Sequence, residues 1–126
     1  MLKIVNNKIY IVRGDDEVLQ ADIHFTDAQR TPYEMEAGDV LTLSVRALPL
    51  ETSPLLMQLR SAPGSSRIEL KHADTAKLAY GAYSADLQLT RSDGRRMTIW
   101  PTQLSGDRLK GRNLKNFNVA AEVTMG

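Results

Sequence analysis

The pattern that decides the fold lies in residues 78–89, which read Leu78-Ala79-Tyr80-Gly81-Ala82-Tyr83-Ser84-Ala85-Asp86-Leu87-Gln88-Leu89. From Tyr83 onward apolar and polar side chains alternate, which is the period of a strand with one buried and one solvated face. A tyrosine at the strand entry, two residues after a glycine, indicates a tyrosine corner, whose phenol hydroxyl bonds back to the preceding chain. We expect Leu78, Gly81 and Tyr83 to form this corner. A plain core tyrosine is the alternative.

The same alternation recurs in short segments along the rest of the chain. We expect strands near residues 9–13, 19–26, 41–47, 55–59, 68–70, 83–90, 97–100 and 117–123. Turn sequences separate them, with Ser92-Asp93-Gly94 typical of a hairpin. Asp74 is the expected N-cap of a single helical turn over residues 74–78. Evenly spaced short strands predict an all-β fold, an immunoglobulin-like β-sandwich of about seven or eight antiparallel strands.

Size and composition fit one folded domain covering residues 1–126. The chain has 126 residues, of which 42% are apolar and 25% are charged, enough apolar side chains for a core. There is no cysteine, which excludes disulfides and thiolate metal sites and suits assembly in a bacterial cytoplasm. No apolar run reaches the roughly 18–20 residues of a membrane span, and the N-terminus lacks the apolar stretch of a secretory signal. We therefore expect no membrane partner.

Charge is unevenly distributed although the formal net charge is only +1, too small to predict nucleic-acid binding. Residues 91–115 carry seven basic side chains against two acidic ones, whereas residues 1–36 carry four basic against seven acidic. Two solvated surfaces are one interpretation. Complementary docking between copies or partners is the other. The candidate interface residues are Arg95, Arg96, Trp100, Arg108, Lys110 and Arg112.

No constellation for catalysis is evident in the sequence. The two histidines, His24 beside Asp22 and His72 near Asp74, lie on different expected elements, and a metal site usually needs three or four ligands. There is no Gly-x-Ser-x-Gly motif and no phosphate-binding glycine loop. The consecutive acids of residues 15–17 are better placed for a polar turn than for paired catalytic carboxylates. We expect no enzyme activity and no cofactor.

Trp100 is the only tryptophan. Met97 and Ile99 occupy alternate positions on the same expected strand, so Trp100 is expected to point away from the side that they cover. An exposed tryptophan stacks on sugars or anchors interfaces, and a buried one packs in the sheet. A sugar platform of Trp100 with Tyr80 or Tyr10 is the alternative to a protein interface.

Several segments together resemble a known family. Residues 74–89 resemble the Asp-Thr…Leu-x-Tyr-Gly-x-Tyr-x-x-Asp-[Ile/Leu]-Gln-Leu signature of small immunoglobulin-like tail proteins encoded by phages and prophages of Gram-positive bacteria. The same domain type is similar to the N-terminal domain of phage baseplate upper protein. The other matching segments are Arg13-Gly14-Asp15, Pro32-Tyr33-Glu34-Met35, Gly38-Asp39, Ser92-Asp93-Gly94, Phe117 and Glu122-Val123-Thr124.

The resemblance implies a structural part of the virion tail, made in the host cytoplasm, that docks to other tail or baseplate proteins; further copies of the chain are a second kind of partner that it allows. It implies no catalytic or cofactor residues. The chain departs from the family in one place, because residues 102–116 separate the proline of Trp100-Pro101 from the last strand. Partner surfaces inferred from relatives do not extend to this segment, which carries much of the basic charge.

Overall fold

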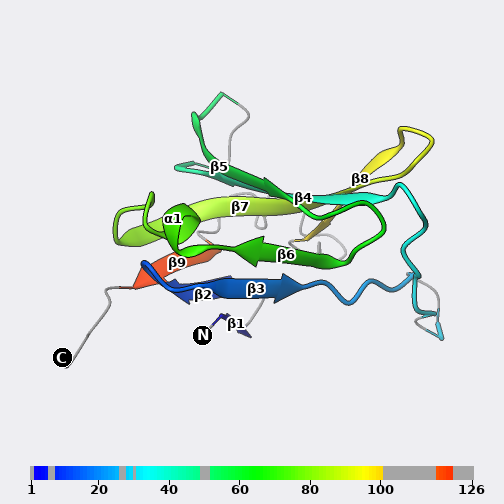
Figure 1. The fold of residues 1–126 in the computed structure, drawn as a ribbon, viewed down its shortest axis with the longest axis horizontal. Helices are drawn as coiled ribbons and strands as arrows, with labels where there is room; N and C mark the ends of the chain where they lie inside the picture. The colour runs from blue at the N-terminus through cyan, green and yellow to red at the C-terminus, as the bar shows by residue number, and fades with distance from the viewer. Residues whose placement is uncertain are drawn as a thin grey trace.

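The chain folds as an all-β sandwich of the immunoglobulin-like kind, as the alternation predicts (Figure 1). A computed structural model describes residues 2–5, 8–25, 28–29, 31–48, 52–100 and 116–120. The elements in these ranges are β1 (Lys3–Val5), β2 (Lys8–Val12), β3 (Glu17–Gln20), β4 (Val40–Arg46), β5 (Leu55–Arg60), β6 (Arg67–Leu70), α1 (His72–Thr75), β7 (Gly81–Thr90), β8 (Arg96–Trp100) and β9 (Phe117–Ala120). No helix in these ranges is long and apolar enough to cross a membrane.

Two sheets form the layers. The larger has the order β1-β2-β9-β7-β4-β5, with β8 also paired to β7, and the smaller consists of β3 and β6. Figure 1 shows β5 at the opposite margin of the larger sheet from β1. The expectation of antiparallel strands holds for every described pairing except β2 with β9, which are parallel. A parallel pair needs a long connection, and nearly the whole chain separates these two strands.

The core lies between the sheets and is built from the alternating apolar positions. On β4, and on β7 from Ala85 onward, every second side chain is buried, in register across the pair: Leu41 faces Leu89 and Leu43 faces Leu87. Burying each such side chain contributes roughly 1.5–3 kcal/mol. The buried apolar residues are Ile9, Ile11, Leu19, Leu41, Leu43, Val45, Met57, Ile68, Leu70, Leu78, Ala85, Leu87, Leu89, Phe117 and Val119.

The second expected strand is shorter than the sequence predicts. The strand β3 ends at Gln20, and the backbone N–H of Ala21 makes a last bond to Ser66. The chain then pairs loosely with residues 31–33 around an isolated bridge between His24 and Pro32. His24 and Pro32 form a non-hydrogen-bonded pair, flanked by the bonds from Phe25 to Thr31 and from Tyr33 to Ile23, so the described pairing consists of two hydrogen bonds and not of a regular strand.

The helical turn also lies earlier than expected. The helix α1 spans His72–Thr75 with Lys71 at the N-cap, so the prediction of Asp74 as N-cap is wrong. Asp74 stands at the third helical position and its carboxylate accepts the Lys71 backbone N–H at 3.0 Å. An acidic side chain at the third helical position accepts a backbone N–H at the start of the helix, as an N-cap side chain also does. Composition alone does not distinguish the two positions.

One edge of β7 is shared by two strands. Near its start β7 pairs with β9, where Tyr83 faces Phe117, and near its end it pairs with β8, where Leu87 faces Trp100. Both strands run antiparallel to β7, so they are the halves of one strand interrupted by residues 101–116. Only residues 84–86 separate the two contact points on β7. Residues 101–116 are therefore an insertion between two segments that pair with the same edge of β7.

Asn116 closes the gap between the halves. Its side-chain oxygen accepts the Ala85 backbone N–H at 2.7 Å, and its side-chain nitrogen donates to the Ala85 carbonyl at 2.8 Å. The asparagine is 3% exposed, so it replaces a strand partner in the dry interior. Because buried backbone groups need partners, this side chain lets the strand break without a loss of pairing on β7.

The expected direction of Trp100 is wrong. The β7–β8 register shifts between Leu87 and Gln88, which pair with Trp100 and Thr98 and leave Ile99 as an extra residue. This bulge turns Trp100 to the face of Leu87, and both Ile99 and Trp100 pack against the core while Met97 is 43% exposed. A one-residue shift reverses which face each following side chain occupies.

Replacing Asn116 by alanine is expected to destabilise the protein by about 2–4 kcal/mol, because two buried backbone groups of Ala85 lose their partners. Urea unfolding measures the change. The matched control is Asn118→Ala, which removes one long bond of 3.4 Å to the Ile9 carbonyl and should cost far less. Equal losses from the two variants would show that Asn116 does not carry the pairing.

Candidate functional site

The described candidate interface residues lie on and after the β7–β8 hairpin. Gly94 has a φ of 93° at the turn, and the Arg91 N–H bonds to the Arg95 carbonyl at 2.7 Å, so the predicted hairpin is confirmed. The Arg95 side chain is 73% exposed and its Nε lies 3.3 Å from the Asp93 carboxylate. Arg96 is exposed on β8. The hairpin therefore presents two arginines to solvent.

The structure does not place the candidate residues as one surface. Trp100 is partly buried and packs against the core, whereas Arg95 and Arg96 are exposed. Arg108, Lys110 and Arg112 lie outside the described residues. Of the predicted interface, the structure therefore describes only the hairpin arginines and Trp100. The role of the basic segment stays a prediction.

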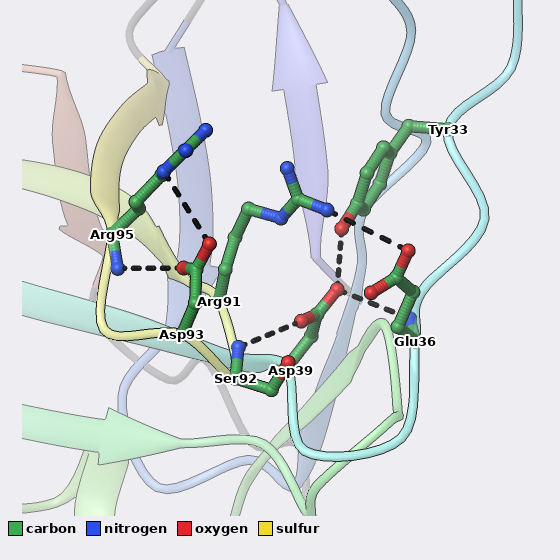
Figure 2. A network of polar contacts seen from close by, with 7 residues as sticks. All are labelled: Tyr33, Glu36, Asp39, Arg91, Ser92, Asp93 and Arg95. Atoms are coloured by element: carbon green, nitrogen blue, oxygen red, sulfur yellow. Dashed lines mark hydrogen bonds and ion pairs between the residues drawn. The ribbon is translucent and has the colours of Figure 1, made fainter.

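A buried carboxylate holds the base of this hairpin (Figure 2). Asp39 is fully buried and accepts three hydrogen bonds: from the Tyr33 hydroxyl, from the Glu36 backbone N–H at 3.0 Å and from the Ser92 backbone N–H at 3.2 Å. Figure 2 shows Arg91 beside the same group, with its guanidinium 3.5 Å from Glu36 and 5.8 Å from the centre of the Tyr33 ring. We call these five residues the Asp39 network.

The hydrogen bonds set the titration of the Asp39 network. The bond from Tyr33, followed by that from Glu36, lowers the pKa of Asp39, and the same bond to Asp39 raises the pKa of Tyr33. A carboxylate that accepts several donors stays charged, and a phenol that donates to it stays neutral. The network therefore ties residues 33–39 to the start of the hairpin at Ser92, through the Asp39 carboxylate that also accepts the Tyr33 hydroxyl.

A second polar cluster lies at the turn between β2 and β3. The Arg13 guanidinium donates to the carbonyls of Ala76 and Leu78, each at 2.8 Å, and the Gly14 N–H donates to the Thr75 hydroxyl at 3.0 Å. Thr75 is fully buried and donates onward to the Asp15 carbonyl at 2.8 Å. We call Arg13, Gly14, Asp15 and Thr75 the Thr75 network. Two segments that are remote in sequence and belong to the family-like pattern meet here.

The tyrosine at the start of β7 makes the contact that defines a corner. The Tyr83 hydroxyl donates to the Ala79 carbonyl, four residues upstream, at 2.7 Å. Gly81 has a φ of 147°, a backbone conformation that side chains disfavour, and Leu78 is buried beside the core. The backward bond thus closes the loop that Arg13 also holds, and it attaches α1 to β7.

The histidines serve local contacts. His24 lies 3.4 Å from Asp22, and the His72 backbone N–H donates to the Asp16 carboxylate at 2.6 Å while its ring contacts the Gly14 carbonyl. In the part of the chain that the structure describes, no group of three or more His, Asp or Glu side chains is arranged to hold a metal ion. Within those residues, the structure does not bring the two histidines and their neighbouring aspartates into one site.

Sequence reasoning missed a charged groove. It lies where the end of β5 approaches β6 and α1, and we call it the open-side groove; its lining is Arg60, Ala62, Ser65, Arg67, Glu69, Lys71 and Asp74. These side chains come from two sheets and a helix. No spacing rule along the chain connects them, so only the folded arrangement shows that they share one surface.

Comparison with models of protein families and with curated proteins gives no match.

The Tyr83→Phe variant is expected to lose about 1 kcal/mol of stability, because it removes one hydrogen bond and leaves the Ala79 carbonyl without its donor. Thermal or urea unfolding measures this. Tyr80→Phe is the control, since that ring is 58% exposed and contacts Arg13 through its face, which phenylalanine keeps. If both substitutions cost the same, the corner bond contributes nothing specific.

Stability is expected to depend on Asp39 and Asp86 with opposite signs. Asp39 has a folded-state pKa below its usual 3.8, so its stabilising contribution is present above pH 3.8 and is lost as the pH falls through the lower folded value. Burial raises the pKa of Asp86 above 3.8, with Arg46 opposing, so its contribution is present below pH 3.8 and is lost as the pH rises through the folded value.

Unfolding free energies of wild type, Asp39→Asn and Asp86→Asn between pH 2 and 7 measure both effects. The difference in unfolding free energy between the wild type and Asp39→Asn should become smaller as the pH falls through the folded-state pKa of Asp39. The unfolding free energy of the wild type should rise relative to that of Asp86→Asn as the pH falls toward 4. Parallel curves for all three proteins would contradict the assignment.

Proposed function

We propose that this chain is a non-catalytic structural or adaptor domain of a phage tail or baseplate, which works through protein–protein contacts in the virion. Its partners are other tail or baseplate proteins, with further copies of itself as an additional possibility. It is made in the bacterial host cytoplasm and has no nucleic-acid or membrane partner. The family resemblance is the basis of the proposal, and the contacts among the residues that carry the resemblance support it.

The observation that carries the proposal is where the family-like residues lie. Arg13-Gly14-Asp15 and the Asp74-Thr75 pair meet in the Thr75 network, and Tyr33 and Asp39 meet the Ser92 hairpin in the Asp39 network. A chance likeness between short motifs has no reason to join them in space. The shared residues close the ends of the sandwich, so they support a common scaffold whose function lies in its surface.

The surface supports contact rather than chemistry. The β7–β8 hairpin presents Arg95 and Arg96 from a base that the Asp39 network holds in place, which is suited to orienting a docking partner. Exposed apolar side chains elsewhere include Leu48, Leu55, Leu56, Phe25 and Val18. Single exposed apolar residues are common, but those next to an unpaired strand edge favour association.

The second candidate function is a carbohydrate- or host-surface-binding module. Tyr10 and Tyr80 favour it, because their rings are 41% and 58% exposed. Trp100 does not contribute, since it packs against the core, so any sugar platform rests on the tyrosines. A glycan titration in which wild type, Tyr80→Ala and Trp100→Ala all fail to bind would exclude this candidate.

Reversing the charge at the hairpin is expected to slow docking. Arg96→Glu should lower the association rate with a tail partner about tenfold at low salt, because exposed charge steers encounter more than it holds the complex. Native mass spectrometry with candidate tail proteins identifies the partner, and stopped-flow mixing measures the rate. Lys77→Glu, at an exposed position directly before the tyrosine corner, is the control. Metabolic neighbours for the gene, or no association with any tail protein, would exclude the proposed function.

A further inference from the structure

Two strands expose a free edge on the same side of the sandwich. In the described residues β5 pairs only with β4, and β6 pairs only with β3. The two strands approach each other across the open-side groove. An unpaired strand edge offers backbone donors and acceptors to any extended chain that reaches it. What matters for each strand is therefore whether its outward backbone groups already have hydrogen-bond partners.

The edge of β6 is satisfied at both of its ends. The Ala21 N–H bonds to the Ser66 carbonyl, so by antiparallel alternation the backbone of Arg67 and Lys71 faces away from β3. The Arg67 N–H donates to the Ser65 hydroxyl at 3.1 Å and the Lys71 N–H to Asp74 at 3.0 Å. Side chains thus take the outward donors at both ends of β6, and only the Glu69 backbone between them faces outward, so β6 offers a shorter template than β5 for an added strand.

Among the described residues, the edge of β5 away from β4 has no strand partner. The Ser61 N–H bonds to the Leu41 carbonyl, so alternation turns the backbone groups of Gln58 and Arg60 away from β4. The register of β4 and β5 shifts between Val45 and Arg46, which leaves Leu56 without a partner on β4. Leu56 is 40% exposed, and the strand contains no proline that would remove a donor. This edge has the features of a site for strand addition.

The groove beside this edge carries uncompensated positive charge. Its two acids are engaged within the groove: Glu69 lies 3.2 Å from Lys71, and Asp74 accepts the Lys71 backbone N–H. Neither Arg60 nor Arg67 has a carboxylate partner among the described residues, and Arg60 contacts only the Gln58 side-chain oxygen, at 3.1 Å. Arginine pairs with carboxylates through two parallel hydrogen bonds, so these two side chains specify an acidic ligand.

We propose that the open side of the sandwich takes up an extended acidic segment of a partner protein, which pairs with the free edge of β5 and places its carboxylates against Arg60 and Arg67. A second copy of the chain docking through its own β5 fits less well, because residues 55–60 contain no acid and bring another Arg60. The inference rests on the proposed contact function and names the chemistry of one partner.

The probe is a synthetic peptide, acetyl-Thr-Val-Glu-Val-Glu-Val-Thr-amide, with a counterpart in which both glutamates are lysine. Backbone amide chemical shifts of the full chain are followed during titration with each peptide. The acidic peptide should bind with a millimolar or tighter dissociation constant, shift the amides of Leu56, Gln58 and Arg60, and weaken as salt is added. The lysine peptide should not bind.

Matched variants separate the groove from general basic charge. Arg60→Glu with Arg67→Glu should weaken binding of the acidic peptide at least about tenfold. Arg95→Glu with Arg96→Glu changes the same number of charges on the hairpin and should leave binding unaltered. Gln58→Pro removes an outward N–H without touching the β4 ladder and should also weaken binding, which gives a second route if the charge-reversed protein is unstable.

Four results would overturn the inference. They are no shift with about 5 mM acidic peptide, equal binding of the lysine peptide, binding that leaves the β5 amides unshifted, and a concentration-dependent dimer of the free chain that Gln58→Pro abolishes. The last would assign the edge to a second copy. Native mass spectrometry can also show a tail partner that still binds the Arg60/Arg67 variant. That result would exclude this site for that partner, but it would still support the proposed contact function.

Discussion

The structure depends on β7 being paired along both edges. On one side β4 runs beside it in register, and on the other β9 and β8 take its two ends in turn. The Asn116 side chain supplies the pairing that is missing between them, with two hydrogen bonds to Ala85 in the dry interior. Because a buried backbone group without a partner costs free energy, this one amide lets a central strand tolerate a long insertion in its neighbour.

The two ends of the sandwich are closed by different chemistry with the same effect. At one end the buried carboxylate of Asp39 gathers Tyr33 and the β7–β8 hairpin, and at the other Arg13 and Thr75 hold the chain that leads into the tyrosine corner. Each network joins segments that are far apart in sequence. The sides of the sandwich lie between these two networks, and on the open side the edge of β5 has no strand partner among the described residues.

The alternation of apolar residues predicted most of the sheet because it is a local property. Leu41, Leu43 and Val45 are buried in β4 as the two-residue period requires, and the hairpin at Gly94 follows from turn chemistry. The errors arose where a partner strand decides the outcome. Trp100 reversed direction because of a bulge, and β3 ends at Gln20 because that residue pairs with Arg67, where the partner strand β6 begins.

By itself, the amino-acid sequence determined the all-β class, the hairpin and the residues of the tyrosine corner, since each depends on neighbours within a few positions. It also limited the candidates for chemistry, because it contains no cysteine and only two histidines. Only the tertiary structure decided which edges are closed, where Trp100 points, and that Arg60 and Arg67 face one groove. Those features depend on hydrogen-bond register and on packing between remote segments, neither of which a single sequence records.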